Sequence, residues 1–150
     1  MDAIAVAPEP RQARSRETRR RLVEACIAVL VERGLARTST SEVCRRAGVS
    51  QGALFKHFPS KQALFAATLA ALFAQLVSDY RRALARPDRG GDRLAAAVAL
   101  LWEIFRRPAL QAAFELRVAA RTDPALRAAL EAVQARHREP LLRAARELFP

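Results

Sequence analysis

The sequence predicts an all-α fold from three observations. Apolar residues recur at three- and four-residue spacing along most of the chain, no run alternates with a period of two, and capping residues mark several helix starts. Hydrophobic residues make up 51% of the 150 residues, which excludes a disordered chain and is enough for a real core. We therefore expect one or two small helical domains.

The first helix is expected over residues 17–33, with Gly34 ending it. Leu22, Cys26 and Val29 repeat at three- and four-residue spacing and form one apolar stripe. This stripe is expected to cover the two helices that follow.

Two short helices with capping signals are expected next. They cover residues 40–47 and 51–58. Ser39 caps the first, and Glu42 stands three residues later, so hydroxyl and carboxylate can each satisfy an unpaired amide. Gly48 can take the left-handed conformation that ends a helix, and Ser50 then caps the second. Two capped helices around one glycine turn are typical of a helix-turn-helix that reads DNA.

The second short helix has one inward and one outward face. Leu54 and Phe58 lie one turn apart and can anchor it inward. Gln51, Phe55 and Lys56 are left facing outward. Their amide and ammonium groups can hydrogen-bond base edges and phosphates in a major groove.

A long helix is expected from Ser60 to about Arg86, and it links the two halves of the chain. Ser60 caps it and places Lys61 in the first turn, where the helix dipole disfavours a cation. Lys61 is therefore expected to have a partner such as phosphate. Leu64 and Leu69 belong to a broad apolar surface along this helix.

Three further helices are expected in the second half of the chain. They cover residues 94–105, residues 109–121 and the stretch that Asp123 opens as a cap. Pro87, Gly90 and Gly91 mark the loop before them. Pro140 is expected to kink or break the last helix.

The stretch AGVSQGALFKHFPSKQALF, residues 47–65, resembles the TetR family of transcriptional regulators, together with the helix before it and its Gly34 turn. The resemblance implies an N-terminal three-helix helix-turn-helix DNA-binding domain at residues 17–63. A C-terminal helical ligand-binding and dimerisation bundle at residues 64–150 would follow. The expected function is a ligand-responsive repressor that binds a palindromic operator in double-stranded DNA as a homodimer.

The same resemblance assigns DNA-contacting roles. The base-facing residues would be Gln51, Gly52, Ala53, Phe55 and Lys56, the phosphate-contacting ones Thr38, His57 and Lys61, and Ser50 completes the set as the cap. Ala53 stands where the family often has threonine, and Phe55 where it usually has tyrosine. Two hydroxyls that could bond to DNA are therefore missing, although Phe55 can still touch a thymine methyl.

Charge agrees with a polyanionic partner. The net charge is +11, and a genome with a base bias towards arginine codons accounts for most of it. That bias does not explain a cluster just before the DNA-binding unit: Arg11, Arg14, Arg16, Arg19, Arg20 and Arg21. Residues 1–16 are expected to form a flexible basic arm that lies along phosphates or enters the minor groove; a solvated tail explains it equally well.

A ligand pocket is expected among the C-terminal helices. Trp102, Phe105 and Phe114 can line a cleft, and Arg117 and Arg121 stand one turn apart on one face. This combination suits a small apolar or amphipathic effector, flat or aliphatic, with an acidic group. An ordinary core with two surface arginines is the alternative.

The end of the chain bears on the expected homodimer. By resemblance, the helix that begins near Asp123 is the first of two that pair with the same two of a second subunit, and the second is absent. The chain is then either truncated or a shortened regulator. The apolar row over residues 126–148 can dimerise, or it can pack on Trp102 and Phe105 of its own chain.

The sequence gives little support to an enzyme, and we expect no catalytic residue, metal or cofactor. His57 and His137 lack metal-ligand spacing, and there is no glycine-rich phosphate loop or nucleophile elbow. No signal peptide and no membrane-spanning window is expected, so the protein is expected to be cytoplasmic. Two alternatives remain: a DNA-binding dimer without a ligand, and a basic amphipathic protein on anionic membranes, which would not require the capped helices.

Overall fold

The computed structural model describes residues 10–84 and 93–148. This part of the chain is helical and contains no strand, so the predicted all-α class is confirmed. The elements are α1 (Pro10–Arg33), the short 3-10 helix η1 (Leu35–Arg37), α2 (Thr40–Ala47), α3 (Gln51–His57), α4 (Lys61–Leu84), α5 (Arg93–Phe105), α6 (Pro108–Ala119) and α7 (Pro124–Leu148). The predicted loop at Pro87, Gly90 and Gly91 lies outside the described residues, as do residues 1–9 of the predicted arm.

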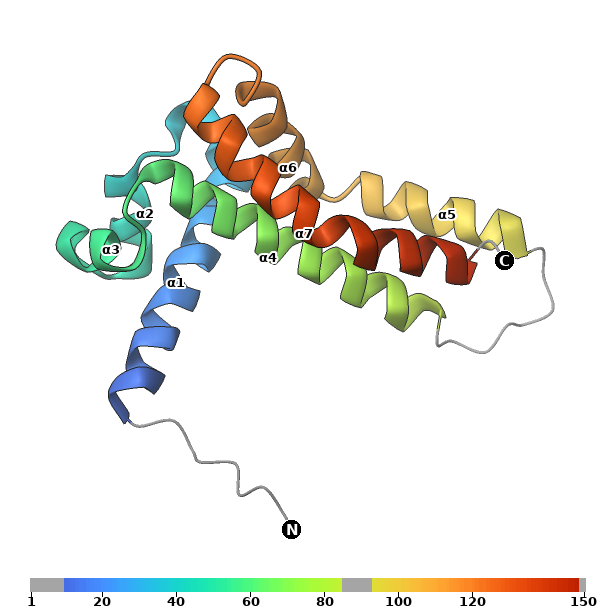
Figure 1. Cartoon of the computed structure of the whole chain (residues 1–150), viewed down its shortest axis with the longest axis horizontal. Helices are drawn as coiled ribbons and strands as arrows, with labels where there is room; N and C mark the ends of the chain where they lie inside the picture. Colours follow the sequence, from blue (N-terminus) through green and yellow to red (C-terminus); the bar gives the residue numbers. More distant parts are fainter. Residues whose placement is uncertain (1–9, 85–92, 149–150) are drawn as a thin grey trace, which may run out of the picture.

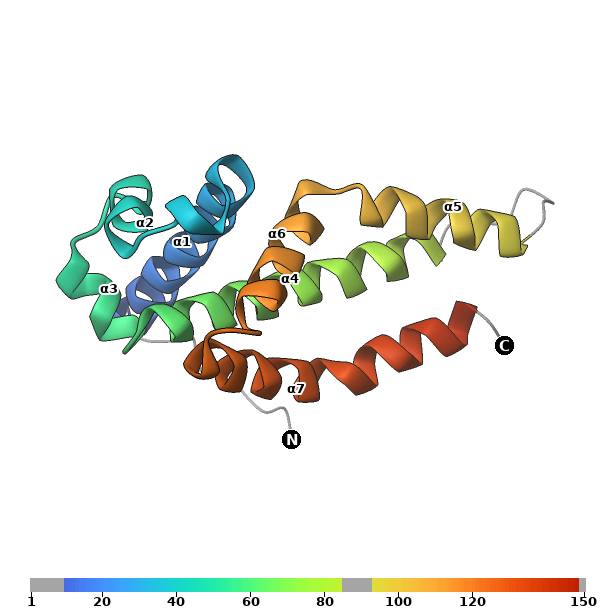
Figure 2. The same cartoon turned by 90° about the horizontal axis from the view of Figure 1, so that it is seen from above.

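The helices α1, α2 and α3 gather at one end of the long axis of the molecule, and α5 lies towards the other end (Figures 1 and 2). The long helix α4 connects the two ends and packs along α7. Between them, α6 contacts α1, α4, α5 and α7. The second half of the chain therefore touches the first half directly, through α6 as well as through α4.

The three predicted serine caps are all confirmed. The Oγ atoms of Ser39, Ser50 and Ser60 accept hydrogen bonds from the amides of the residues three positions on, each at 3.1 Å. Gly48 ends α2 in the left-handed conformation, with φ 64° and ψ 41°. Glu42 differs from the expected capping box, because its carboxylate bonds to Arg45 and Arg33. The turn between α2 and α3 is thus fixed by local signals.

The first helix begins at Pro10, seven residues before the predicted start. Proline suits the first helical position, because its missing N–H would have no partner there.

Three of the clustered arginines are used inside the protein. Arg19 lies over the Phe58 ring at 4.7 Å, Arg20 pairs with neighbouring glutamates of α1, and Arg21 donates to the Ala47 carbonyl. They stabilise the DNA-binding helices from α1 and are not part of a free arm.

One hydrophobic core runs through both halves of the described chain. It is built from α1, α2, α3, α4, α6 and α7, with the following members among others: Leu22, Cys26, Val43, Leu54, Phe58, Leu64, Leu69, Ala113, Leu116, Leu126 and Leu130. Ala112 and Ala113 let α6 approach α1 closely, because their side chains are small. The helix-turn-helix is therefore packed on the rest of the protein.

The helix α7 uses its apolar row within the chain. Leu126, Leu130 and Val133 are buried in the core, where α7 packs on α4. The row was expected to dimerise or to pack on Trp102 and Phe105, which are instead 63% and 51% exposed. The helix also continues through the proline at position 140, so the predicted break does not occur.

One stretch, Lys61–Asp79 in α4, is long and apolar enough to cross a membrane by length and composition alone. This corrects the expectation that no such window exists. Leu64, Phe65 and Leu69 of this stretch are buried in the core. Packing on α1, α6 and α7 therefore accounts for part of its apolar composition, since 28% of the stretch is buried.

Leu54 is the residue by which α3 is anchored, and its side chain is fully buried. We expect Leu54→Ala to lower the free energy of unfolding by about 2–5 kcal/mol, because it leaves a cavity beneath α3. Urea denaturation followed by circular dichroism measures this. The neighbouring Phe55 is 47% exposed, so Phe55→Ala is the matched control and should change stability by less than about 0.5 kcal/mol. Equal losses would show that α3 is not held in this orientation.

Candidate nucleic-acid interface

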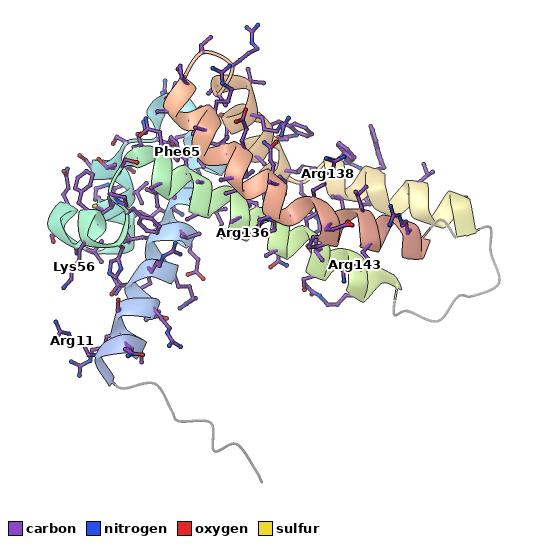
Figure 3. The ribbon with its side chains drawn as sticks, viewed as in Figure 1. Arg11, Lys56, Phe65, Arg136, Arg138 and Arg143 are labelled. Atoms are coloured by element: carbon purple, nitrogen blue, oxygen red, sulfur yellow. The ribbon has the colours of Figure 1, made fainter. Side chains whose placement is uncertain are left out.

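The outer face of α3 carries the predicted base-facing residues. Gln51, Gly52, Phe55 and Lys56 are exposed, whereas Leu54 is buried on the opposite face. Lys56 points away from the body of the molecule (Figure 3). Burial of one face and exposure of the other follow from the helical period, so α3 can enter a groove without losing its anchor.

Gln51 is oriented by a contact that the sequence did not reveal. Its Nε2 donates to the Oγ of Ser41 on α2, at 2.6 Å. This contact uses one of the two N–H groups of the amide, so the second N–H and the carbonyl oxygen Oε1 remain for a partner. An acceptor at this place matches a base that presents an amino group in the major groove, which adenine and cytosine do.

The remaining residues at the start of α3 shape its approach to a partner. Ser50 is exposed, and its Oγ accepts the Ala53 amide. A side chain added at Gly52 would meet only this same Ser50 Oγ, at 3.9 Å, so the surface there is open. Ala53 is half-buried. Small residues in this turn let the backbone come close to a ligand.

The three predicted phosphate contacts have different surroundings. Thr38 is 1% exposed, its Oγ1 donates to the Gly34 carbonyl and its amide to the Leu35 carbonyl. Both of its donors are therefore used inside the protein. His57 and Lys61 are half-buried, and the Lys61 ammonium lies 5.1 Å from the Phe65 ring centre. The flexible stem of Lys61 leaves its ammonium able to reach an anion nearby.

Ion pairs balance much of the charge on α2. Arg45 hydrogen-bonds Glu42, and Arg46 hydrogen-bonds Glu32 of α1. These arginines hold the pKa of both carboxyls below the ordinary value, so both stay ionised at neutral pH. At the free end of α1, Arg11 is exposed and lies at the same end of the molecule as Lys56 (Figure 3). Exposed basic residues are thus present on both α3 and α1 at this end of the molecule.

The predicted ligand-pocket residues do not line one cavity. Phe105 and Phe114 stack with ring centres 6.1 Å apart, but both are about half exposed, and Trp102 is 63% exposed. Arg117 and Arg121 line a separate hollow between α6 and α7, of about 210 Å³. The apolar side chains of α5 and α6 that were assigned to a cleft face outward instead.

A different cavity, of about 60 Å³, lies where α4, α5 and α6 meet. Its walls are mostly apolar: Leu72, Phe73, Leu76, Ile104, Ala109 and Leu110, with Gln75, Asp79 and Arg107 as polar members. Asp79 is the enclosed member of an ion pair, since its side chain is 12% exposed and that of Arg107 is 48% exposed. Asp79 was not among the residues predicted from the sequence, although an acidic residue at the end of an apolar stretch of α4 was a usable signal.

No group of three or more potential metal ligands occurs in the described residues. His57 and His137 lie on different helices: the His137 ring is tilted against the Phe73 ring, with 5.8 Å between centres, and its Nδ1 is hydrogen-bonded to the Val133 carbonyl. His137 thus has a structural environment on α7.

Comparison with known proteins agrees with this geometry. The family described as "Bacterial regulatory proteins, tetR family" matches residues 22–68, from α1 into α4. An uncharacterized HTH-type transcriptional regulator of Mycobacterium tuberculosis (strain ATCC 25618 / H37Rv) is 37% identical over 112 residues. That match covers 75% of this chain and 57% of the relative, so the chain spans little more than half the relative's length.

Two solved structures extend the comparison beyond the matched segment. A transcriptional regulator from Rhodococcus sp. Rha1 is 31% identical, with a TM-score of 0.60, over 87% of this chain and 77% of that one. The multidrug binding protein EbrR, complexed with proflavin, is 27% identical, with a TM-score of 0.53, over 79% of this chain and 71% of that one.

The family match falls on the caps, the glycine turn and the exposed α3 described above. The relatives are named as transcriptional regulators and not as enzymes. The chain therefore belongs to the tetR family of bacterial regulatory proteins, and α1, α2 and α3 form its helix-turn-helix DNA-binding domain.

Proposed function

We propose that this chain regulates transcription in the bacterial cytoplasm by placing α3 in the major groove of operator DNA. The observation that carries the proposal is the pairing of a buried anchor, Leu54, with an exposed set, Gln51, Phe55 and Lys56, on one capped helix. Residues 17–63 act as the DNA-binding unit and residues 64–150 as the regulatory and dimerising unit. Repression then follows if the operator overlaps a promoter.

The working form in this proposal is a homodimer on a palindromic operator. One short helix buries too little surface for tight specific binding, and a two-fold dimer presents two such helices to two half-sites. The structure supplies a surface that supports this. Val98, Trp102 and Phe105 of α5 are exposed, as are Phe114 and Val118 of α6. Covering these side chains with a second subunit would remove a large apolar area from water.

The proposed effector site is the cavity between α4, α5 and α6. Asp79 pairs with Arg82 as well as with Arg107 and is more enclosed than either, so the carboxylate requires cations beside it more strongly than these guanidinium groups require an anion. The effector that suits this lining is an apolar molecule with a cationic group, and its binding would widen the cavity of about 60 Å³. This replaces the acidic effector expected from Arg117 and Arg121, which lie outside the cavity.

A cationic effector would act by taking the place of Arg107. Arg107 precedes α6 and joins α5 to it, and its guanidinium bonds to Asp79 of α4. Displacing it would release the junction of α5 and α6 from α4. The likeness to the multidrug binding protein EbrR, which was solved in complex with proflavin, supports a small-molecule ligand for this fold. The alternative is a dimer that binds DNA without a ligand. In that case the ion pair between Asp79 and Arg107 only stabilises the fold.

The first prediction on function separates base reading from phosphate binding. Gln51→Ala should remove a preference for adenine or cytosine at one position of each half-site, a loss of about 1–3 kcal/mol. Lys61→Ala should weaken binding to all sequences alike and lower the salt slope by about one unit. Binding selections from a random duplex library, repeated at several salt concentrations, measure both. If Gln51→Ala weakens specific and random DNA equally, Gln51 does not read a base.

The second prediction concerns the dimer. Trp102→Glu combined with Val118→Glu changes two side chains that are 63% and 66% exposed, so the subunit should stay folded. The variant should become monomeric and lose at least about tenfold in operator affinity. Light scattering and DNase footprinting follow the two effects. A wild-type chain that protects a single half-site as a monomer with nanomolar affinity would refute the proposed dimer.

The third prediction concerns the effector. Cationic aromatic amines should raise the melting temperature, whereas neutral analogues of the same ring system should not. Asp79→Asn should abolish the shift, and Glu131→Gln in the α6–α7 hollow is the matched control. Weakening of operator binding tenfold requires about 1.4 kcal/mol of coupling. Fluorescence of Trp102 follows binding. If acidic compounds bind instead, and Arg121→Gln abolishes their binding, the assigned cavity is wrong.

A further inference from the structure

A carboxylate of the second half of the chain holds the turn between α1 and α2. Gly34 ends α1, and the next amide, that of Leu35, donates to Oε2 of Glu115 on α6 at 2.7 Å. The approach is close, because a Cβ built on Gly34 would lie 3.4 Å from the same oxygen. Glu115 is 80 residues away from Leu35 in sequence. This contact is a long-range tether between α6 and the DNA-binding domain.

The tethered turn is rigidly connected to α2 and α3, the two helices of the helix-turn-helix. Within it, Thr38 bonds through its hydroxyl to Gly34 at 2.8 Å and through its amide to Leu35 at 3.0 Å. Ser39, the next residue, caps α2. Since α2 in turn holds Gln51 of α3, a displacement of the Leu35 amide is passed on to the base-facing side chains.

A second carboxylate holds the domain at another point. Asp123 caps α7 through the Leu126 amide at 2.9 Å and also hydrogen-bonds Gln62 in the first turn of α4. The charge of Lys61 acts on it from the same turn. The first turn of α4 follows the end of α3 by only a few residues. The helices α6 and α7 therefore each contact the DNA-binding domain through a polar side chain.

Glu115 lies on the helix that bears the other functional surfaces. Its neighbours Phe114 and Val118 belong to the proposed dimer surface, and Leu110, earlier in α6, lines the proposed effector cavity. A movement of α6 caused at either surface reaches the Leu35 amide through one rigid helix. Ala113 is a small buried residue of α6, and apolar packing of this kind between α6 and α1 depends little on direction. The hydrogen bond from the Leu35 amide to Glu115 adds a contact that does depend on direction.

We propose that Glu115 is a positioning residue that sets the orientation of the DNA-binding domain on α6, and thereby the distance between the two recognition helices of a dimer. Asp123 assists it at the start of α4. The inference rests on the proposed dimer on DNA and adds to it the determinant of half-site spacing. Two-fold proteins bind half-sites about one helical turn, or a multiple, apart, so a small rotation of each domain changes which spacing fits.

The test compares Glu115→Ala and Glu115→Gln with the control Glu103→Gln. Glu103 is exposed on the neighbouring α5 and pairs with Arg106 at 3.6 Å. Each full-length chain is assayed on duplexes that carry the half-site selected by the wild type, either once or twice at varied spacing. Hydrogen exchange of the Leu35 amide is measured in the same proteins, and light scattering verifies that they remain dimers.

For Glu115→Ala we expect exchange of the Leu35 amide to accelerate at least about tenfold, because its acceptor is gone. The affinity for a single half-site should stay unchanged, while the preference for one spacing over the others should fall at least about fivefold. Glu115→Gln keeps an acceptor oxygen and should retain most of the protection and of the preference. Glu103→Gln should match the wild type.

Faster exchange with an unchanged spacing preference would overturn the proposal, because the tether would then be structural only. Unchanged exchange in Glu115→Ala would overturn it as well, by showing that the contact does not protect the amide. If Glu115→Ala does not fold, Glu115→Leu, which also removes the acceptor of the Leu35 amide, carries the test, and a wild-type spacing preference in it would count against the proposal. A wild-type chain that is indifferent to spacing would instead refute the proposed dimer itself.

Discussion

The shortness of α3 is the constraint on which the rest of the structure depends. A helix of seven residues is not stable alone in water, because nucleation costs more than a few hydrogen bonds return. It forms here because Ser50 caps it and because Leu54 and Phe58 are buried beneath it. The arginines of α1 serve the same end: Arg19 covers the ring of Phe58 and Arg21 bonds to the end of α2. The order of the exposed face of α3 therefore depends on the helices that pack behind it.

Local signals made the DNA-binding half predictable. A serine cap, a glycine in the left-handed region and an apolar pair one turn apart each act within a few residues, so Ser39, Ser50, Gly48 and the pair Leu54 and Phe58 could be read from sequence alone. The exposed face of α3 followed from the same period. Contacts between elements could not be predicted in this way: the bond from Gln51 to Ser41 and the burial of Thr38 depend on how the helices pack.

The residues predicted to line a ligand cleft do not come together in the structure, for a physical reason. Helices α5 and α6 carry apolar residues around most of their circumference, so their spacing does not say which side faces inward. Trp102 and Phe114 fit a cleft by composition, yet the structure turns them outward and encloses Ile104 and Leu116 instead. Asp79 was the more informative residue, because a charge placed among apolar side chains needs a specific partner.

Because both halves of the described chain share one hydrophobic core, the stability of the exposed face of α3 depends on residues far from it. Leu54 of α3, Leu64 of α4 and Leu116 of α6 belong to one cluster, so the two halves are expected to melt in one cooperative transition and not as separate units. A substitution that loosens α6 then reduces the number of intact molecules, even where no DNA contact changes. The bound fraction of an operator would then fall because less folded protein is present. Such variants would look like weak regulators, although their folded molecules bind DNA normally.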